Sequence, residues 1–232
     1  MKQIPQFATD FFACGKNAGD WMFAGHQYQI LHNAINASAY TYSCAKAVAM
    51  REKLHVEQNL VIGHIGRFDA QKNHTFLLDI FSECVKFVPN AKLLLVGDGE
   101  GRNHIQDKVK KLGLEDKVIF TGVCNDVADL LSAMDVFVFP SLYEGVPVTM
   151  IEAQASGLPC VISDGVPKEC IITSGLVTTM KLTDMPCGWA KHIIERSQTK
   201  RENHLNEIQA AGYDIVTAAK ELENFYLTKY GE

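Results

Sequence analysis

A pair of glutamates carries the clearest chemical signal in the chain. Glu144 and Glu152 are separated by seven residues, which include Gly145 and Pro147. We expect Glu144 in the loop after a strand and Glu152 in the second turn of the helix that follows. A helix N-terminus favours a phosphate or an oxyanion, because its N–H groups are free and carry partial positive charge. The two carboxylates could then hold sugar and ribose hydroxyls, although the same pattern also fits an ordinary helix start with two solvated acids.

Two cations follow a glycine earlier in the chain. Arg67 comes directly after Gly66, and Lys72 lies five residues beyond Arg67. An arginine can grip phosphate oxygens through two N–H groups, and a lysine adds a point charge. This pattern suits a phosphate site at the opening of a helix, and the alternative is a surface loop with ordinary basic residues.

A second glycine pair, Gly97 and Gly99, leaves room for close approach of a backbone or a ligand. As a dinucleotide fingerprint it is weak, because Arg102 stands where the third glycine of G-x-G-x-x-G would be, and because the pair follows the second strand rather than the first. The alternative interpretation is a glycine-rich turn between a strand and a helix.

Alternating strands and helices must bring these residues together. Short apolar runs predict strands at residues 60–66, 91–97, 117–122, 135–140 and 158–163. Amphipathic spacing predicts helices at residues 73–88, 102–112, 127–134 and 147–156. Unbroken apolar strands that alternate with helices indicate an α/β fold with a doubly wound, Rossmann-like parallel sheet. The loops after the strands then meet at the carboxyl edge of the sheet, where such sheets bind ligands.

The two ends of the chain follow a different pattern. We expect one strand over residues 7–14, a helix over 15–24 and another strand over 28–32. Residues 36–59 predict a loop and one helix. The tail from about residue 185 is predicted to be helical, with one helix over residues 215–226.

Composition limits the class of protein. The 232 residues carry a net charge of -5, which argues against a nucleic-acid partner. No apolar run is long enough to span a membrane. Seven cysteines without a C-x-x-C pair indicate reduced thiols in a cytosolic protein rather than a disulfide framework or a zinc site.

Taken in order, the motifs resemble those of a known family. They read Gly-Arg-Phe-x-x-x-Lys, Leu-Val-Gly-Asp-Gly, Phe-Thr-Gly, and Pro-Ser-x-x-Glu-Gly-x-Pro-x-x-x-x-Glu-Ala-x-Ala-x-Gly-x-Pro. This order is similar to that of the nucleotide-sugar-binding half of the retaining family-4 glycosyltransferases, which have the two-domain GT-B fold. The resemblance runs from about residue 30 to residue 165 and is greatest to the exopolysaccharide and capsular-polysaccharide branch.

The resemblance implies a role for each matching residue. Arg67 and Lys72 would neutralise the donor diphosphate as it leaves, and Glu144 would contact the transferred sugar near the reacting centre. These three are the predicted catalytic residues. The predicted binding residues would surround the phosphates, nucleotide, base, sugar and ribose; they are Gly66, Gly97, Gly99, Thr121, Gly122, Val123, Gly145, Val146, Pro147, Thr149 and Glu152. The chain has no Asp-x-Asp, which fits a family that needs no metal or other cofactor.

The resemblance also implies a function and a domain division. The enzyme would transfer a sugar with retention from a nucleoside-diphosphate-sugar, most commonly a UDP-sugar, to a polysaccharide or lipid-linked acceptor. We expect residues 1–27 to be a remnant of the acceptor-side domain, residues 28–200 the donor domain, and residues 201–232 helices that run back toward the acceptor side. The chain alone should bind donor but transfer sugar poorly or not at all. The full-length protein is expected in the cytoplasm, at the inner face of the membrane.

Other functions stay open at this stage. A nucleotide-sugar epimerase of the same architecture would share the phosphate and ribose contacts, but its additional acid–base residues are not evident. A non-catalytic nucleotide-binding module would also fit the motifs. A nicotinamide-dependent oxidoreductase is disfavoured, because the first strand is followed by Gly-Arg-Phe-Asp rather than by a glycine-rich fingerprint.

Overall fold

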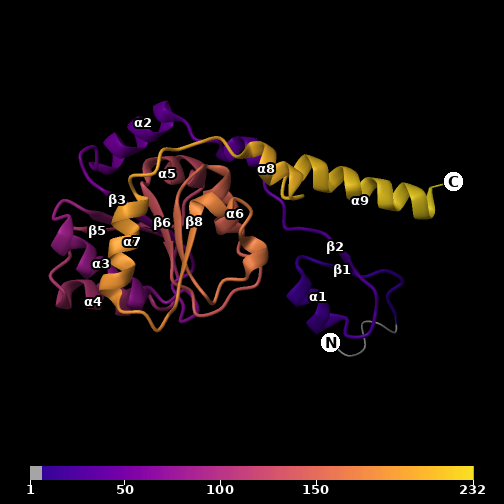
Figure 1. The fold of residues 1–232 in the computed structure, drawn as a ribbon, viewed down its shortest axis with the longest axis horizontal. Helices are drawn as coiled ribbons and strands as arrows, with labels where there is room; N and C mark the ends of the chain where they lie inside the picture. The colour runs from indigo at the N-terminus through magenta and orange to yellow at the C-terminus, as the bar shows by residue number, and fades with distance from the viewer. Residues whose placement is uncertain (1–6, 232) are drawn as a thin grey trace.

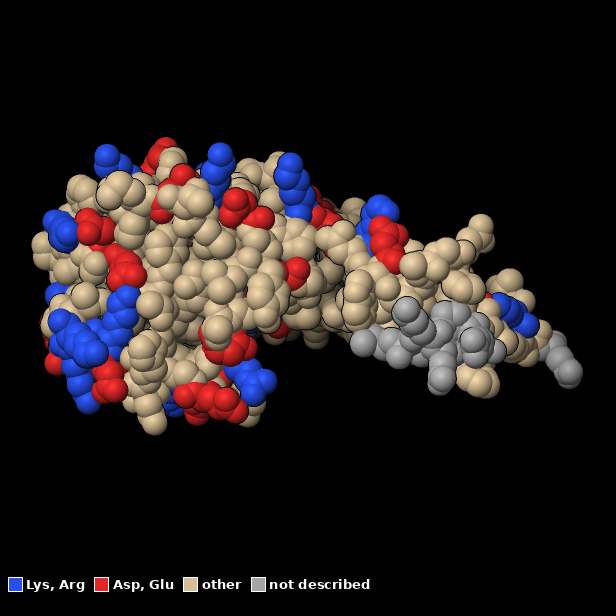
Figure 2. All heavy atoms as spheres, turned by 90° about the horizontal axis from the view of Figure 1, so that it is seen from below, with Lys and Arg blue, Asp and Glu red and all other residues tan. Residues whose placement is uncertain are grey.

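The computed structural model describes residues 7–231. It consists of an α/β body from which an N-terminal segment and a long C-terminal helix extend together to one side (Figure 1). The first six residues of the predicted remnant at 1–27 lie outside the described residues, and the predicted domain boundaries stay a prediction. On the face shown in Figure 2, acidic and basic side chains are interspersed and much of the surface is uncharged.

A six-stranded parallel sheet forms the centre of the body. Its strands are β3 (Val61–Ile65), β4 (Lys92–Val96), β5 (Val118–Gly122), β6 (Val136–Phe139), β7 (Cys160–Ser163) and β8 (Val177–Met180). They lie in the order β5-β4-β3-β6-β7-β8, and every neighbouring pair is parallel. This confirms the predicted doubly wound sheet. The chain winds outward from β3 in one direction and from β6 in the other, so the order reverses between β3 and β6. In sheets of this type, ligands bind beyond the carboxyl ends of the strands at that switch point.

The sixth strand was not among the predicted elements. The residues of β8 are half-buried or exposed, and two of the four are threonines. None of the four residues of β8 is fully buried, so this strand needs no continuous apolar run. The apolar signal that identified the five other strands is therefore absent here.

Helices cover both faces of the sheet (Figure 1). One face packs against α3 (His74–Phe87), α4 (Arg102–Lys111) and α7 (Pro186–Arg196), and the other against α2 (Cys44–Leu54), α5 (Val127–Ala133) and α6 (Val148–Ala155). Successive strand residues point to opposite faces, as Leu93 and Leu95 pack in the first core and Leu94 in the second. All three are fully buried, which explains why the strands read as unbroken apolar runs.

The N-terminal segment is less regular than predicted. Only β1 (Phe12–Ala13) and β2 (Gln29–Ile30) form strands, paired in parallel, with α1 (Lys16–Met22) between them. The predicted strands at 7–14 and 28–32 are therefore too long, because each has only two residues of partner backbone. A 3-10 helix, η2 (Ala37–Tyr40), then leads into α2.

The C-terminal part consists of the short η3 (Lys168–Cys170) and η4 (Ser174–Leu176) before β8, and α8 (Leu205–Ala210) and α9 (Ile215–Tyr230) after α7. The α9 helix extends beyond the predicted end at residue 226 and lies beside the N-terminal segment, where Phe225 packs edge-on against Phe12 and Lys229 pairs with Asp10. Within residues 7–231, no helix combines the length and the apolar character needed to cross a membrane.

Candidate functional site

The loops that follow β3 and β6 are joined at the central crevice of the sheet. The backbone N–H of Leu142 donates to the carbonyl of Gln71 at 2.8 Å. The side-chain amide of Asn73 donates to the carbonyl of Pro140 at 3.1 Å. These two bonds fix the loop after β3 (residues 66–73) against the loop after β6 (residues 140–147), so the predicted cation motif and the predicted acid motif lie at one place.

An ion pair between Lys72 and Glu144 forms the centre of this contact. The Lys72 ammonium lies 2.7 Å from Oε1 of Glu144, and the two side chains are only 16% and 5% exposed. Oε2 of Glu144 accepts a hydrogen bond of 3.0 Å from the amide of Gln71. The ammonium also lies 4.7 Å from the centre of the Phe139 ring, within cation–π distance. Both charged groups are therefore held in fixed positions before any ligand binds.

Arg67 lies apart from this pair. It follows directly after β3, so it shares the carboxyl edge of the sheet with Lys72, but its side chain is exposed. Among residues 7–231 no carboxylate lies within ion-pair distance of its guanidinium. The structure thus brings Lys72 to Glu144 and leaves Arg67 free to take a ligand's charge.

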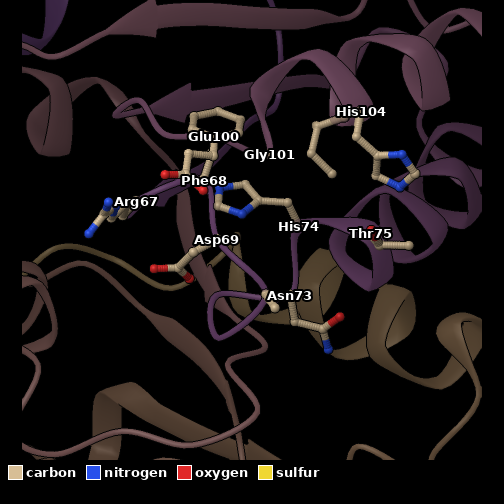
Figure 3. Close-up of a pocket in the computed structure, with 11 residues that line it drawn as sticks. Arg67, Phe68, Asp69, Asn73, His74, Thr75, Glu100, Gly101 and His104 are labelled. Carbon is tan, nitrogen blue, oxygen red and sulfur yellow. The ribbon is translucent and has the colours of Figure 1, made fainter.

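A cavity of about 550 Å³ opens on the α3 and α4 side of the loop after β3. Arg67 lies at one edge of this cavity and His104 at the other (Figure 3). Lys72, Glu144 and Glu152 do not line it. The carboxylates of Asp69 and Glu100 do, and they would repel a diphosphate. The crevice between β3 and β6 is therefore the better candidate site for an anionic ligand.

Glu152 lies in the second turn of α6, as the sequence predicts, and is half-buried. Its Oε1 accepts a hydrogen bond of 2.7 Å from the hydroxyl of Tyr40. Burial raises the pKa of Glu152, and the Tyr40 hydrogen bond acts in the opposite direction. Burial of Tyr40 is the main cause that raises the pKa of its hydroxyl, and the hydrogen bond to Glu152 acts in the same direction. The hydroxyl therefore stays protonated and donates.

The start of α6 is open toward the crevice. Pro147 precedes the first helical residue, and a Cβ placed on Gly145 would meet no atom within 4 Å. The first N–H groups of any helix have no partner within the helix, so those of Val148 and Thr149 are available to a ligand. Val146 has a different environment, because its Cγ2 lies 2.7 Å from a Cβ placed on Gly15 of the N-terminal segment.

Gly97 and Gly99 allow two loops to cross. Gly97 has φ +129°, and a Cβ placed on it would lie 2.2 Å from the carbonyl oxygen of Gly66. Gly99 has φ +159°, and its Cβ would lie 2.7 Å from the carbonyl oxygen of Phe68. Both positions need glycine for loop packing alone, and the further prediction that they make room for a nucleotide stays a prediction.

Of the predicted base-contacting residues, Thr121 and Gly122 end β5 and Val123 follows it directly; β5 is an edge strand of the same sheet. The Thr121 hydroxyl donates to the backbone carbonyl of Gly122 at 3.0 Å. Val123 is 80% exposed, which is unusual for valine, and is available to a ligand. The backbone N–H of Gly97 donates to the carbonyl of Gly122 at 2.8 Å, which ties this turn to the glycine turn after β4.

Two residues of the site were not found from the sequence. Tyr40 lies 112 positions from Glu152, and Gln71 lies 73 positions from Glu144. A tyrosine in a connecting segment and a glutamine beside a lysine are both common in proteins, so neither residue type nor spacing marks them as part of a site. Both became visible only when the fold placed them against the two acids.

Comparison with known proteins identifies the family. The model of the family "Glycosyl transferases group 1" matches residues 59–198. The chain is 33% identical over 228 residues to the putative glycosyltransferase EpsF of Bacillus subtilis, which covers 94% of this chain and 59% of that protein. It is 30% identical over 151 residues to the UDP-Gal:alpha-D-GlcNAc-diphosphoundecaprenol alpha-1,3-galactosyltransferase of Escherichia coli, covering 62% of this chain and 38% of that protein.

A solved structure shows the same fold. Anabaena Alr3699/HepE, crystallised in complex with UDP and glucose, superposes with a TM-score of 0.81 at 23% identity, over 97% of this chain and 64% of that one. The chain thus spans about three fifths of EpsF and slightly more of HepE. The resemblance predicted from the motifs is confirmed: the chain belongs to the group 1 glycosyltransferases, and its six-stranded sheet is that of the C-terminal GT-B domain of this family.

Proposed function

We propose that this chain is the donor-binding part of a glycosyltransferase that moves a sugar, with retention of configuration, from a nucleoside-diphosphate-sugar to a polysaccharide or lipid-linked acceptor. The observation that carries the proposal is the buried Lys72–Glu144 pair beside the open start of α6, at the switch point of the sheet. This arrangement supports the proposal because it would offer a diphosphate-linked sugar a fixed cation, helix N–H donors and a fixed carboxylate.

The diphosphate would lie between Lys72 and the first turn of α6. The ammonium of Lys72 carries three N–H groups, of which Glu144 takes one, so the others can bind phosphate oxygens. The helix N-terminus adds N–H donors and partial positive charge. Arg67 is exposed on the same edge and can add a second cation. Together these groups stabilise the negative charge that develops on the leaving diphosphate, which is the electrostatic form of catalysis.

Glu144 would face the sugar from the other side of the ion pair. Lys72 and Gln71 hold both of its oxygens, so the carboxylate stays in one orientation. A carboxylate that is fixed in advance does not reorganise when the sugar acquires positive charge, which makes its stabilisation more effective. Gly145 leaves space beside it for a ring to approach.

The relatives support a UDP-sugar as donor. HepE was crystallised with UDP and glucose, and the Escherichia coli relative uses UDP-Gal and a diphosphoundecaprenol-linked acceptor. The present chain spans only part of each. We propose the domain division 1–27, 28–200 and 201–232 on that basis, with the acceptor bound mainly outside this chain. The chain alone would then bind donor without transferring sugar, and the whole enzyme would act at the cytoplasmic face of the membrane.

Nucleotide-dependent stabilisation tests this proposal. Thermal unfolding is measured with UDP, GDP, ADP or NAD added to the wild type, to Lys72→Met, and to Lys191→Met, whose side chain is exposed on α7 away from the site. A ligand at about 100 times its dissociation constant adds about 2.7 kcal/mol of stability, or roughly 5–10 °C for a chain of this size. We expect one nucleoside diphosphate to stabilise the wild type and Lys191→Met, and to stabilise Lys72→Met much less relative to its own ligand-free state. Stabilisation by NAD alone, or by no nucleotide, would contradict the proposal.

A further inference from the structure

The Tyr40 ring is held in place from several sides. It ends η2, in the segment that connects the N-terminal residues to α2, and it packs against both the core beneath α6 and the smaller core formed with Tyr213 and Ile208. The same segment is fastened to the start of α9, because Ile35 exchanges backbone hydrogen bonds of 2.9 and 2.8 Å with Tyr213 and Ile215. The position of the Tyr40 hydroxyl is therefore set by the fold.

The Tyr40 hydroxyl fixes the position of one of the two carboxylate oxygens of Glu152. It donates to Oε1 at 2.7 Å. Among residues 7–231 no group donates a hydrogen bond to the other oxygen of Glu152, Oε2. A carboxylate with one oxygen fixed cannot rotate freely, so the second oxygen is presented in a defined direction. The half-buried position of Glu152 keeps water from competing fully for that oxygen.

We infer that Tyr40 is a positioning residue of the nucleotide site: it orients Glu152 so that the free carboxylate oxygen receives the ribose hydroxyls of the donor. The inference rests on the proposed function and extends it to a residue of the connecting segment. It also explains a polar contact that serves neither the ion pair nor the core. Recognition of the ribose then depends on the segment before α2 as well as on α6.

The bond has a second effect on Glu152. Burial raises the pKa of this carboxyl, and the Tyr40 hydrogen bond is the one contact that opposes the rise. Without the hydroxyl, Glu152 is protonated at higher pH and loses its strength as an acceptor. The removal of one oxygen atom from Tyr40 should therefore change both the geometry and the charge state of the group that meets the ribose.

Tyr40→Phe tests the inference, because it removes only the hydroxyl. Dissociation constants are measured by calorimetry for UDP and for 2′,3′-dideoxy-UDP, which lacks both ribose hydroxyls. The matched control is Tyr42→Phe, since Tyr42 is two residues away and stacks with Arg201 rather than with Glu152. We expect Tyr40→Phe to weaken UDP about tenfold, which corresponds to about 1.4 kcal/mol, and to change dideoxy-UDP less than about twofold. Tyr42→Phe should leave both unchanged.

The Glu152→Gln background provides a second arm that needs UDP alone. If Tyr40 acts through the carboxylate, Tyr40→Phe should cost much less UDP affinity in this background than in the wild type, because contacts in one network are not additive. In the Glu152-containing protein, Tyr40→Phe should also shift the acidic loss of UDP binding to higher pH. Equal weakening of UDP and dideoxy-UDP, or an unchanged effect in the Glu152→Gln background, would overturn the inference.

Failure of the inference is separable from failure of the proposed function. The wild type can bind UDP through Lys72 while Tyr40→Phe keeps the wild-type ratio of affinities for UDP and dideoxy-UDP. In that case only the role of Tyr40 is wrong. If the wild type binds no nucleoside diphosphate, the proposed function fails and the inference fails with it.

Discussion

The loss of stability on removal of the Lys72 charge should measure how firmly the Lys72–Glu144 pair is held before a ligand binds. Lys72→Met keeps the aliphatic stem and deletes the charge, which leaves the Glu144 carboxylate with Gln71 as its remaining partner. The Glu144 side chain is only 5% exposed, so it cannot replace the ammonium with water. Breaking a buried ion pair by removing one partner costs about 3–5 kcal/mol. Because Lys72 itself retains 16% exposure, we expect the lower end, about 3 kcal/mol.

Substitution of the other partner of the ion pair, Glu144, should cost less stability. Glu144→Gln keeps an oxygen that accepts from Lys72, and the lysine stem can carry its ammonium toward solvent. We expect about 1–2 kcal/mol for this change. The double variant Lys72→Met/Glu144→Gln should be at least about 1 kcal/mol more stable than the sum of the single effects predicts, because neither buried charge is then left alone.

Urea unfolding at neutral pH, followed by circular dichroism, measures these differences. A surface pair provides the control: Lys110 and Asp107 lie 3.9 Å apart with side chains about two-thirds exposed, so Lys110→Met should change stability by less than about 0.5 kcal/mol. A loss below about 1 kcal/mol in Lys72→Met, or strict additivity in the double variant, would refute the reasoning that the pair is fixed and desolvated.

Four further substitutions test other parts of the structure. Burial lowers the pKa of His74 from 6.5 to about 4, and both ring nitrogens lack a partner among the described residues. The unfolded chain takes up the proton first as pH falls, so His74 should lower the free energy of unfolding by about 3 kcal/mol between pH 7 and pH 4. His74→Phe should reduce the slope of stability against pH in urea titrations, and the buried His64 beside it, whose pKa is also lowered, should account for a remaining part. Gly97→Ala should lower stability by more than about 2 kcal/mol, because φ at this position is +129° and the new Cβ would strike a carbonyl oxygen. The control Gly188→Ala, at an open position in α7, should raise stability by about 0.5–1 kcal/mol. Burial raises the pKa of Glu152, which penalises its ionised form and makes stability fall as pH rises through that pKa; Glu152→Gln should therefore raise the melting temperature at pH 7 while it weakens UDP binding.

Each of these predictions has a contradicting result. A pH slope that is unchanged in His74→Phe would assign the acid sensitivity to other groups. Equal effects of the two alanine substitutions would show that the crossing of the loops does not require Gly97. A lower melting temperature of Glu152→Gln at pH 7 would mean that the ionised carboxylate stabilises the ligand-free fold.

The central sheet could be predicted because its physics is local. Each inner strand is buried on both faces, so residues such as Leu93, Leu94 and Leu95 must all be apolar, and that run is visible in the sequence. The edge strand β8 obeys no such rule, and its half-exposed threonines gave no signal. The short β1 and β2 were overestimated, because propensity alone does not limit a strand, whereas the length of the paired partner does.

The candidate site was predictable by residue type but not by contact. Spacing placed Lys72 and Glu144 at one edge of the sheet, yet their ion pair depends on how two loops cross, which the sequence does not specify. The glycine at position 97 was noticed for its freedom, while its requirement comes from the Gly66 carbonyl beside it. Tyr40 gave no signal at all, because its role depends on a segment returning to α6 across 112 positions.

A crystal structure of this chain with bound UDP tests the central claim most directly. We predict the diphosphate in the crevice between β3 and β6, with its oxygens on Lys72 and on the N–H groups that begin α6, and the ribose against Glu152. Density for the diphosphate in the cavity lined by Arg67, His74 and His104, away from Lys72 and α6, would contradict it.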